Sequence, residues 1–262
     1  MNSLLKNKTI LVTKSKEEAF KSVSILADHG AELIFFPTIK VVPIFNSPEL
    51  DEAIKMFNNF DYLVFTSSNA VEVFAEIMQR YRLNLSKVKI AAVGKSTADE
   101  CESRGITVTI LPDEFSANGL VKKFSEIDLK NKKIFIPGSS LSRGELNMGL
   151  SELGAQVFSV PVYDVVQNEL SDLKNEHKQI QKKHPNVFVF TSPSAFSNFL
   201  TLMNVTDPDK FFDAHIICAI GTTTENAIRK KGLTVHIVPD TFSLNGVSEA
   251  IIKYFQVTAN VA

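Results

Sequence analysis

Short apolar runs recur along the chain, and each is followed by a stretch whose apolar residues have helical spacing. The runs are continuously apolar rather than alternating, which is typical of strands buried on both faces of a parallel sheet. In the first half of the chain we expect such strands at residues 10–13, 32–36, 62–66, 90–93 and 107–111.

The intervening stretches carry helix signals. Val23 and Ala27 lie on an apolar face that stops at Gly30, a residue typical of the position just past a helix end. Ser47-Pro48 has the pattern of an N-cap followed by proline in the first turn. Alternating strands and helices predict an α/β fold with doubly wound parallel sheets and right-handed crossovers.

The chain also repeats itself at an offset of 124 to 127 residues. NKTILVT at 7–13 recurs as NKKIFIP at 131–137, and DYLVFTSSNA at 61–70 recurs as NVFVFTSPSA at 186–195. The order is kept in two later matches: IAAVG from 90 with ICAIG from 217, and PDEFSANG from 112 with PDTFSLNG from 239. This pattern indicates an ancient duplication, and each copy is large enough to be a domain.

Two equivalent segments interrupt the alternation. Residues 36–44 (FPTIKVVPI) and 160–167 (VPVYDVVQ) are extended and punctuated by proline. Each can end a strand of one domain and begin the passage to another. Two arrangements remain open at this point. Either the two halves are the domains in order, or the chain crosses at both segments and builds one domain from its middle and one from its ends.

Composition and charge narrow the class of protein. Of the 262 residues, 44% are apolar and 22% charged, as in ordinary globular proteins. The net charge of -1 argues against non-specific nucleic-acid binding. Two cysteines favour a reducing compartment. We expect no secretory signal, no membrane span and a cytoplasmic location.

Candidate chemistry follows the strands, because ligands of open α/β sheets bind beyond the carboxyl ends of the strands. Five of these turns are small and hydroxyl-rich, and each is expected to run straight into a helix. They are TSSN at 66–69, GKST at 94–97, PGSS at 137–140, TSPS at 191–194 and GTTT at 221–224. Helix starts offer free N–H groups and a favourable dipole, so these turns suit carboxylates or phosphates. The same residues also serve simply as N-caps.

Few cations accompany the turns. Lys14 follows the first strand, Lys95 lies in the GKST turn and Arg143 follows the PGSS turn. Each is also compatible with a solvated surface charge. Tyr163 lies in the second crossing segment. Two interpretations remain open: its phenol points into a cleft between domains and donates a proton, or its ring packs on the linker with the hydroxyl in water.

Several familiar sites are missing. The sequence has no G-x-G-x-x-G after a strand, no complete P-loop, no H-E-x-x-H, no C-x-x-C and no G-x-S-x-G. The histidines lack metal-ligand spacing, and Cys101 and Cys218 fall inside predicted elements. We therefore expect no metal and no cofactor. A two-lobed binding protein without catalysis, or an enzyme for a phosphorylated or polycarboxylate small molecule, fits these residues.

The ordered motifs resemble the uroporphyrinogen-III synthase family over nearly the whole chain. The resemblance is carried by ILVTK, LVFTSSNAV, AAVGKST, the FSANGL turn, KIFIPGSSLSR, VPVYDV, VFVFTSPSAF and AIGTTTENAIRKKGL. One departure is Lys14, where bacterial members often have arginine. An arginine there could make a bidentate contact with a carboxylate, which a lysine cannot.

The resemblance implies two flavodoxin-like doubly wound parallel-sheet domains joined by a two-stranded β connection. One domain would hold residues 1–38 and 167–262, and the other residues 39–166, with the active site in the cleft between them. The implied enzyme is a lyase of haem biosynthesis without metal or organic cofactor. It would be a monomer, with a transient contact to the upstream synthase of the pathway.

The implied reaction closes the linear tetrapyrrole hydroxymethylbilane to uroporphyrinogen III, with loss of water and inversion of ring D through a spiro intermediate. By the motif match, Tyr163 would assist departure of the hydroxyl. The remaining residues would bind substrate carboxylates: Lys14, Ser67, Ser68, Lys95, Ser139, Ser192, Ser194, Thr223 and Thr224.

Overall fold

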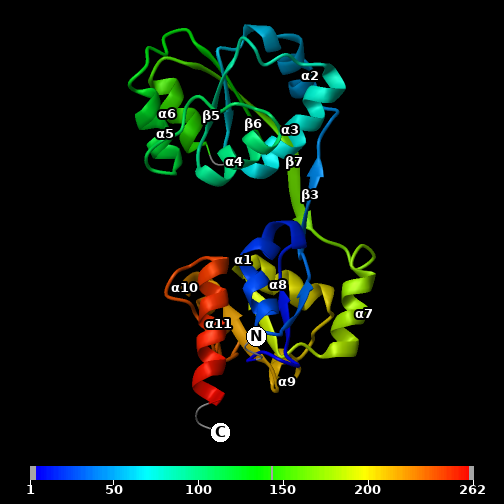
Figure 1. Cartoon of the computed structure of the whole chain (residues 1–262). Coiled ribbons are helices and arrows are strands. Elements are labelled where there is room, and N and C mark those ends of the chain that lie inside the picture. The colour runs from blue at the N-terminus through cyan, green and yellow to red at the C-terminus, as the bar shows by residue number, and fades with distance from the viewer. Residues whose placement is uncertain (1–3, 143, 260–262) are drawn as a thin grey trace. The chain divides into compact units, whose positions relative to one another are not determined.

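The computed structural model describes residues 4–142 and 144–259. The chain forms two compact units (Figure 1). Unit 1 comprises Met1–Lys40 and Gln167–Ala262, and unit 2 comprises Val41–Val166. Among the described residues, no helix has the length and apolar character that a bilayer crossing requires.

Unit 1 is built on a parallel sheet in which every strand is short and apolar. Its order is β2 (Glu32–Phe35), β1 (Thr9–Val12), β8 (Val187–Phe190) and β9 (Ile216–Ala219). Phe188 and Phe190 pack on one face, and Val187 and Val189 pack on the other. Both faces are therefore apolar, which explains why the strand sequences show no polar alternation.

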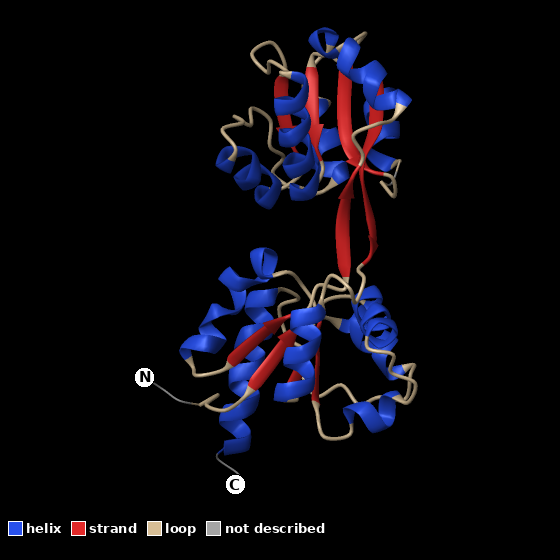
Figure 2. Ribbon diagram, turned by 90° about the vertical axis from the view of Figure 1, so that its right-hand side faces the viewer, coloured by secondary structure: helices blue, strands red, loops and turns tan. Residues whose placement is uncertain are grey.

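Helices cover both faces of this sheet (Figure 2). They are α1 (Lys16–Asp28), α7 (Lys174–Lys183), α8 (Pro193–Leu202), α9 (Pro208–Phe212), α10 (Thr222–Arg229) and α11 (Leu244–Ala259). α1 and α11 contribute to one hydrophobic cluster, and α7 to α10 contribute to the other. Helix α1 ends as predicted, because Gly30 has φ 95° and its N–H donates to Ala27.

Unit 2 has the same construction. Its sheet has the order β3 (Ile39–Pro43), β7 (Gln156–Gln167), β6 (Lys133–Ser139), β4 (Tyr62–Phe65) and β5 (Lys89–Ala92). β7, β6, β4 and β5 are mutually parallel. The helical elements are α2 (Pro48–Lys55), η1 (Phe57–Asn59), α3 (Ser68–Tyr81), α4 (Lys95–Ser103), α5 (Ala117–Phe124) and α6 (Glu145–Glu152). α2, α3 and α4 pack against one cluster and α5 and α6 against the other, so the predicted doubly wound α/β fold is confirmed.

The sequence repeat reappears in the topology. The order β2-β1-β8-β9 of unit 1 corresponds, element by element, to β7-β6-β4-β5 of unit 2. Each unit therefore combines segments from both copies of the duplication. Side chains at matching positions of the repeat make matching hydrogen bonds. Asp61 accepts one from the N–H of Lys133 at 2.9 Å, and Asn186 accepts one from the N–H of Thr9 at 2.8 Å.

One predicted strand is wrong. Residues 107–111 form no strand and make only an isolated bridge from Ile110 to Ala91. The N–H groups of Thr109 and Ile110 both donate to the carbonyl of Ile90, at 2.9 and 3.1 Å. Because two donors share one acceptor, a regular ladder does not continue. The equivalent segment of unit 1 makes the matching bridge between Cys218 and Ile237.

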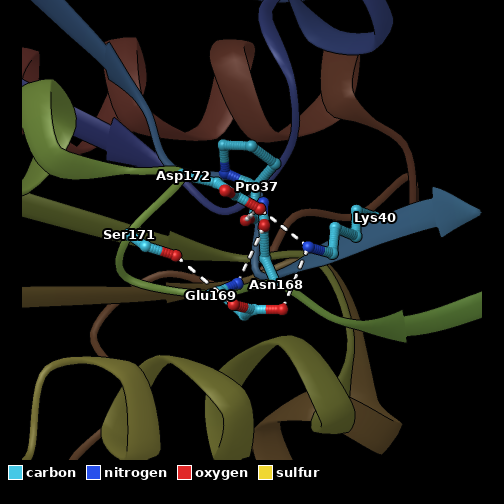
Figure 3. A network of polar contacts seen from close by, with 6 residues as sticks. All are labelled: Pro37, Lys40, Asn168, Glu169, Ser171 and Asp172. Carbon is cyan, nitrogen blue, oxygen red and sulfur yellow. Dashed lines mark hydrogen bonds and ion pairs between the residues drawn. The ribbon is translucent and has the colours of Figure 1, made fainter.

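A polar network fixes the point where β7 ends against the residues leading into β3 (Figure 3). Asn168 is 7% exposed, donates to the carbonyl of Pro37 at 3.0 Å and accepts from the N–H of Glu169 at 2.9 Å. Lys40 binds Asp172 at 2.7 Å and Glu169 at 3.3 Å. The hydrogen bond from Lys40 to Asp172 raises the pKa of this lysine.

Removing the buried amide of Asn168 should lower the free energy of unfolding more than removing the exposed ammonium group of Lys40. We expect Asn168→Ala to lower the free energy of unfolding of unit 1 by roughly 2 kcal/mol, because two backbone groups lose their partners. Lys40→Ala should cost clearly less, since exposed ion pairs contribute little. Urea denaturation followed by circular dichroism measures both. A larger loss for Lys40→Ala would contradict this assignment.

Two histidines of unit 1, His215 and His236, have lowered pKa values. His236 is an exposed residue, but its Nδ1 faces the backbone and accepts a hydrogen bond from the N–H of Ile217 at 3.1 Å; partial desolvation of the ring lowers its pKa. Burial also lowers the pKa of His215, whose ring packs 5.1 Å from that of Phe188. A histidine with a lowered pKa contributes stability that is present above its unfolded pKa of about 6.5 and is lost as the pH falls through its folded pKa.

We therefore expect the urea midpoint of unit 1 to fall as the pH is lowered from about 7 towards 5. His236→Gln, which cannot take up a proton, should show a smaller fall over the same range. An equal fall in His236→Gln and the parent protein would show that this histidine is not responsible.

Candidate functional site

The carboxyl ends of the parallel strands of unit 2 bring together five residues singled out from the sequence: Ser67, Ser68, Lys95, Ser139 and Tyr163. Ser67 caps α3, and its Oγ accepts from the N–H of Ala70 at 3.1 Å. The hydroxyl of Ser68 donates to the carbonyl of Ser96 at 3.3 Å. This bond links the start of α3 to the start of α4, as expected for helices that follow neighbouring parallel strands.

Tyr163 reaches this edge because β7 is irregular. Ser139 on β6 pairs with Tyr163, whereas the preceding pair is Gly138 with Pro161, so one residue of β7 is extra. A regular strand would place Val162 and Tyr163 on opposite faces. Here both belong to the same hydrophobic cluster. A β-bulge of this kind changes the direction in which the following side chains point.

The phenol of Tyr163 therefore meets Ser67. The Tyr163 hydroxyl lies 2.9 Å from Ser67 Oγ, and the whole side chain is 5% exposed. Its ring packs in the cluster that also holds Phe65 and Val71. Ring packing and the hydrogen bond together fix the position of the phenolic oxygen.

The start of α4 keeps its N–H groups free of side-chain caps. Gly94 stands at the N-cap position and makes no side-chain hydrogen bond. Lys95 is exposed and pairs with Asp99 at 3.0 Å. The neighbouring Phe115 is 56% exposed, and a Cβ on Gly94 would lie 3.6 Å from its side chain. An exposed phenylalanine, whose Cβ is its nearest atom to Gly94, thus lies beside an uncapped helix start.

The PGSS turn differs from the prediction. β6 continues through Ser139, and α6 begins only at Glu145, so this turn does not run straight into a helix. The loop returns over Gly138, where a Cβ would lie 2.8 Å from Ser142 Oγ. Ser139 Oγ accepts from the N–H of Leu141 at 3.2 Å, and the Ser140 hydroxyl donates to Asp164. Arg143, the third candidate cation, lies outside the described residues.

The equivalent edge of unit 1 gathers the turns after β1 and β8. Ser192 caps α8, its Oγ accepting from the N–H of Ala195 at 3.0 Å and lying 3.0 Å from Ser194 Oγ. Lys14 pairs with Glu18 at 3.0 Å. Lys14 and Ser192 both line a pocket of ≈ 170 Å³.

Thr38 lines the same pocket and was not anticipated from the sequence. Its side chain is fully buried, and its hydroxyl has no hydrogen-bond partner among the described residues. Ser15, also missed, caps α1 by accepting from the N–H of Glu18 at 3.3 Å. The signal for Ser15 was available, because a serine precedes the apolar face of that helix.

The start of α10 mirrors that of α4. Gly221 holds the N-cap position without a side-chain cap, Thr223 is exposed and Thr224 is 3% exposed. Phe242 is 60% exposed, and a Cβ on Gly221 would lie 3.0 Å from its ring. Phe115 and Phe242 occupy the same place in the repeated PDxFSxNG motif. The repeat was the signal that could have identified this pair.

The cysteines are unsuited to nucleophilic chemistry. Both are free and buried. Burial, with smaller effects from Glu100 and Glu102, raises the pKa of Cys101 to about 12. Burial also raises the pKa of Cys218. In the part of the chain that the structure describes, no group of three or more His, Cys, Asp or Glu side chains could hold a metal ion.

Comparison with known proteins agrees with this architecture. The family model described as "Uroporphyrinogen-III synthase HemD" matches residues 21–249. The chain is 29% identical to a uroporphyrinogen-III synthase of Chlorobaculum parvum, over 94% of this chain and 98% of the relative. It is 28% identical to one of Synechococcus elongatus, over 96% of this chain and 97% of the relative.

The fold has a solved counterpart. The crystal structure of uroporphyrinogen-III synthetase from Helicobacter pylori superimposes with a TM-score of 0.60 at 16% identity, covering 94% of this chain and 99% of that one. The family model covers most of the chain, from α1 to α11. The chain belongs to the uroporphyrinogen-III synthase family, whose enzymes are cyclising lyases of tetrapyrrole biosynthesis.

Proposed function

We propose that this protein converts hydroxymethylbilane to uroporphyrinogen III, losing water and inverting ring D. The match of the family model to residues 21–249 carries this proposal. We propose further that units 1 and 2 act as the two substrate-binding domains, so that residues of both contact one substrate molecule.

The chemistry of the substrate suits the helix starts. Hydroxymethylbilane carries eight carboxylates on four pyrrole rings, so it is both polyanionic and aromatic. The uncapped starts of α4 and α10 offer N–H donors to carboxylates. The exposed residues Phe115 and Phe242, which lie beside these starts, offer apolar surface to a pyrrole. A protein of net charge -1 can thus hold a polyanion through local donors.

The carboxylate-binding residues are assigned by unit. In unit 2 they are Ser68, Lys95 and Ser139. Ser67, which the resemblance also placed in this group, is in contact with Tyr163 and is left out of it. In unit 1 they are Lys14, Ser192, Ser194, Thr223 and Thr224. Thr38, Lys14 and Ser192 line one pocket, whose polar side chains Lys14 and Ser192 suit a carboxylate.

The reaction begins with the departure of the terminal hydroxyl. Tyr163 donates its proton to that oxygen. The carbon–oxygen bond then breaks, water departs, and an azafulvene cation remains. The ring-D carbon that already carries the bridge to ring C attacks this cation and forms the spiro intermediate. The bridge then moves to the other α-carbon of ring D, which loses its proton, and one proton returns to the Tyr163 phenolate. The balance is the loss of one water molecule.

The main task of the protein is geometric. Spontaneous closure joins the unsubstituted carbon of ring D and gives the uninverted isomer. Holding the substituted carbon against the cation requires several carboxylates to be fixed at once, and fixed geometry is a large source of rate enhancement. Donors placed around the charged intermediate add electrostatic stabilisation.

Isomer analysis tests this proposal. Purified protein is supplied with hydroxymethylbilane, the reaction is stopped early, the products are oxidised and the porphyrin isomers are separated. We expect mostly the inverted isomer, formed faster than in the protein-free control. Uninverted isomer at the spontaneous rate would reject the synthase assignment. We further propose that the protein is a monomer, lies in the cytoplasm and makes transient contact with the enzyme that supplies its substrate.

A further inference from the structure

We propose that Ser67 is a positioning residue for Tyr163, directing the phenolic proton towards the substrate and stabilising the phenolate once that proton has left. This inference rests on the proposed function and deepens it, because it assigns Ser67 a role through Tyr163 rather than through a substrate carboxylate. Its basis is the contact of 2.9 Å between the two hydroxyl oxygens.

The other bond of Ser67 decides where its proton goes. Ser67 Oγ accepts from the N–H of Ala70 at 3.1 Å as the N-cap of α3. The hydroxyl hydrogen of Ser67 is not used in that bond and is free to donate to the Tyr163 oxygen. When it does, the phenolic hydrogen cannot point at Ser67 and is available for the leaving hydroxyl.

The same arrangement serves the next step. After proton transfer the Tyr163 oxygen is negatively charged, and the hydroxyl of Ser67 already donates to it. Hydrogen bonds to charged groups are stronger than neutral ones. The Ser67 bond therefore gains strength as the phenolate forms, which is the behaviour required of a group that accelerates the step.

Both partners are held rigidly. Ser67 is fixed by the first turn of a 14-residue helix. Tyr163 is fixed by the bulge in β7 and by packing of its ring in the core of unit 2. The repeat does not provide a second copy, because Ser192, the counterpart of Ser67, lies beside Ser194 instead of a phenol. The pair is thus specific to unit 2.

A double-mutant cycle tests the inference. We expect Ser67→Ala to lower kcat roughly tenfold with KM changed less than about twofold, as for the loss of one hydrogen bond to a charged group. In the Tyr163→Phe background the same change should alter kcat by less than about twofold, because the phenol through which it acts is gone. An equal tenfold loss in both backgrounds would overturn the inference.

Two variants separate positioning from helix capping. Ser67→Thr keeps a hydroxyl that can cap α3 and donate to the phenol, so it should restore most of the kcat lost in Ser67→Ala. Ser47→Ala removes an ordinary cap in the same unit, where Ser47 Oγ accepts from the N–H of Leu50 at 3.1 Å. It should lower stability and leave kcat unchanged. A tenfold loss of kcat in Ser47→Ala would assign the effect to capping.

The outcomes distinguish this inference from the function on which it rests. If the parent protein yields only uninverted isomer at the spontaneous rate, the synthase function fails. If the parent is active and Tyr163→Phe is impaired, but Ser67→Ala acts equally in both backgrounds, only the positioning role of Ser67 fails.

Discussion

Tyr163→Phe is expected to lower kcat by about 10²–10⁴-fold, the usual contribution of a positioned proton donor. The phenylalanine ring fills the same space in the hydrophobic cluster of unit 2, so the fold should persist. KM should change little, because the variant removes the hydroxyl that donates the proton and removes no contact to a carboxylate. Residual activity should remain, since fixing the substrate geometry contributes independently of the proton donor.

Tyr81→Phe provides the matched control. Tyr81 lies in the same unit and donates its hydroxyl to the carbonyl of Phe45 at 3.2 Å, away from the residues assigned to the substrate. Steady-state rates of isomer formation for both variants measure the contrast. Full activity in Tyr163→Phe would exclude the proton-donor role, and equal losses in the two variants would attribute the effect to stability.

The largest stability losses are expected at two glycines related by the repeat. A Cβ on Gly119 would lie 2.0 Å from the carbonyl oxygen of Glu114, and one on Gly246 would lie 2.1 Å from that of Thr241. Both obstacles are backbone atoms in the tight turn that begins a helix, so they cannot rotate away. Either glycine replaced by alanine should cost roughly 3 kcal/mol or more of unfolding free energy.

Hydrogen exchange localises these losses. Gly119→Ala should accelerate exchange in unit 2, and Gly246→Ala should accelerate it in unit 1, each mainly in its own hydrophobic clusters. Gly144→Ala is the control, because a Cβ there meets no atom of the described residues within 4 Å, its chain neighbours aside. Unchanged denaturation midpoints in Gly119→Ala and Gly246→Ala would show that the turns can open without cost.

The strands and helix starts were largely predictable because their signals are local. The strand sequence VFVF at β8 is buried along its whole length, as a continuously apolar run predicts. The turns before α3, α4, α8 and α10 run straight into helices as expected. The caps at Ser47 and the helix end at Gly30 are also confirmed, since both depend on neighbouring residues alone.

The failures involve contacts between residues distant in sequence or changes of register. The PGSS turn departs from its hydroxyl-rich counterparts because the loop after it folds over Gly138. The direction of Tyr163 depends on one extra residue in β7, and strict alternation would have placed its phenol on the other face. The contact with Ser67 joins residues 96 positions apart and was not foreseen.

The equivalence of Phe115 and Phe242 was hidden for a different reason. An exposed phenylalanine has no signature of its own in a sequence that contains 20 of them. Only the recurrence of a phenylalanine beside each uncapped glycine marks these two residues as candidates for the site. The repeat carried this information, but it required the structure to show that the rings remain outside the core.

The central claim is that the protein joins the substituted carbon of ring D to the carbon from which the hydroxyl has departed. The most direct test uses hydroxymethylbilane labelled with ¹³C at its hydroxymethyl carbon and at the ring-D carbon that carries the bridge to ring C. Our account predicts a product in which the two labels are directly bonded, seen as a one-bond carbon–carbon coupling by NMR. A product formed at the spontaneous rate without that coupling would contradict it.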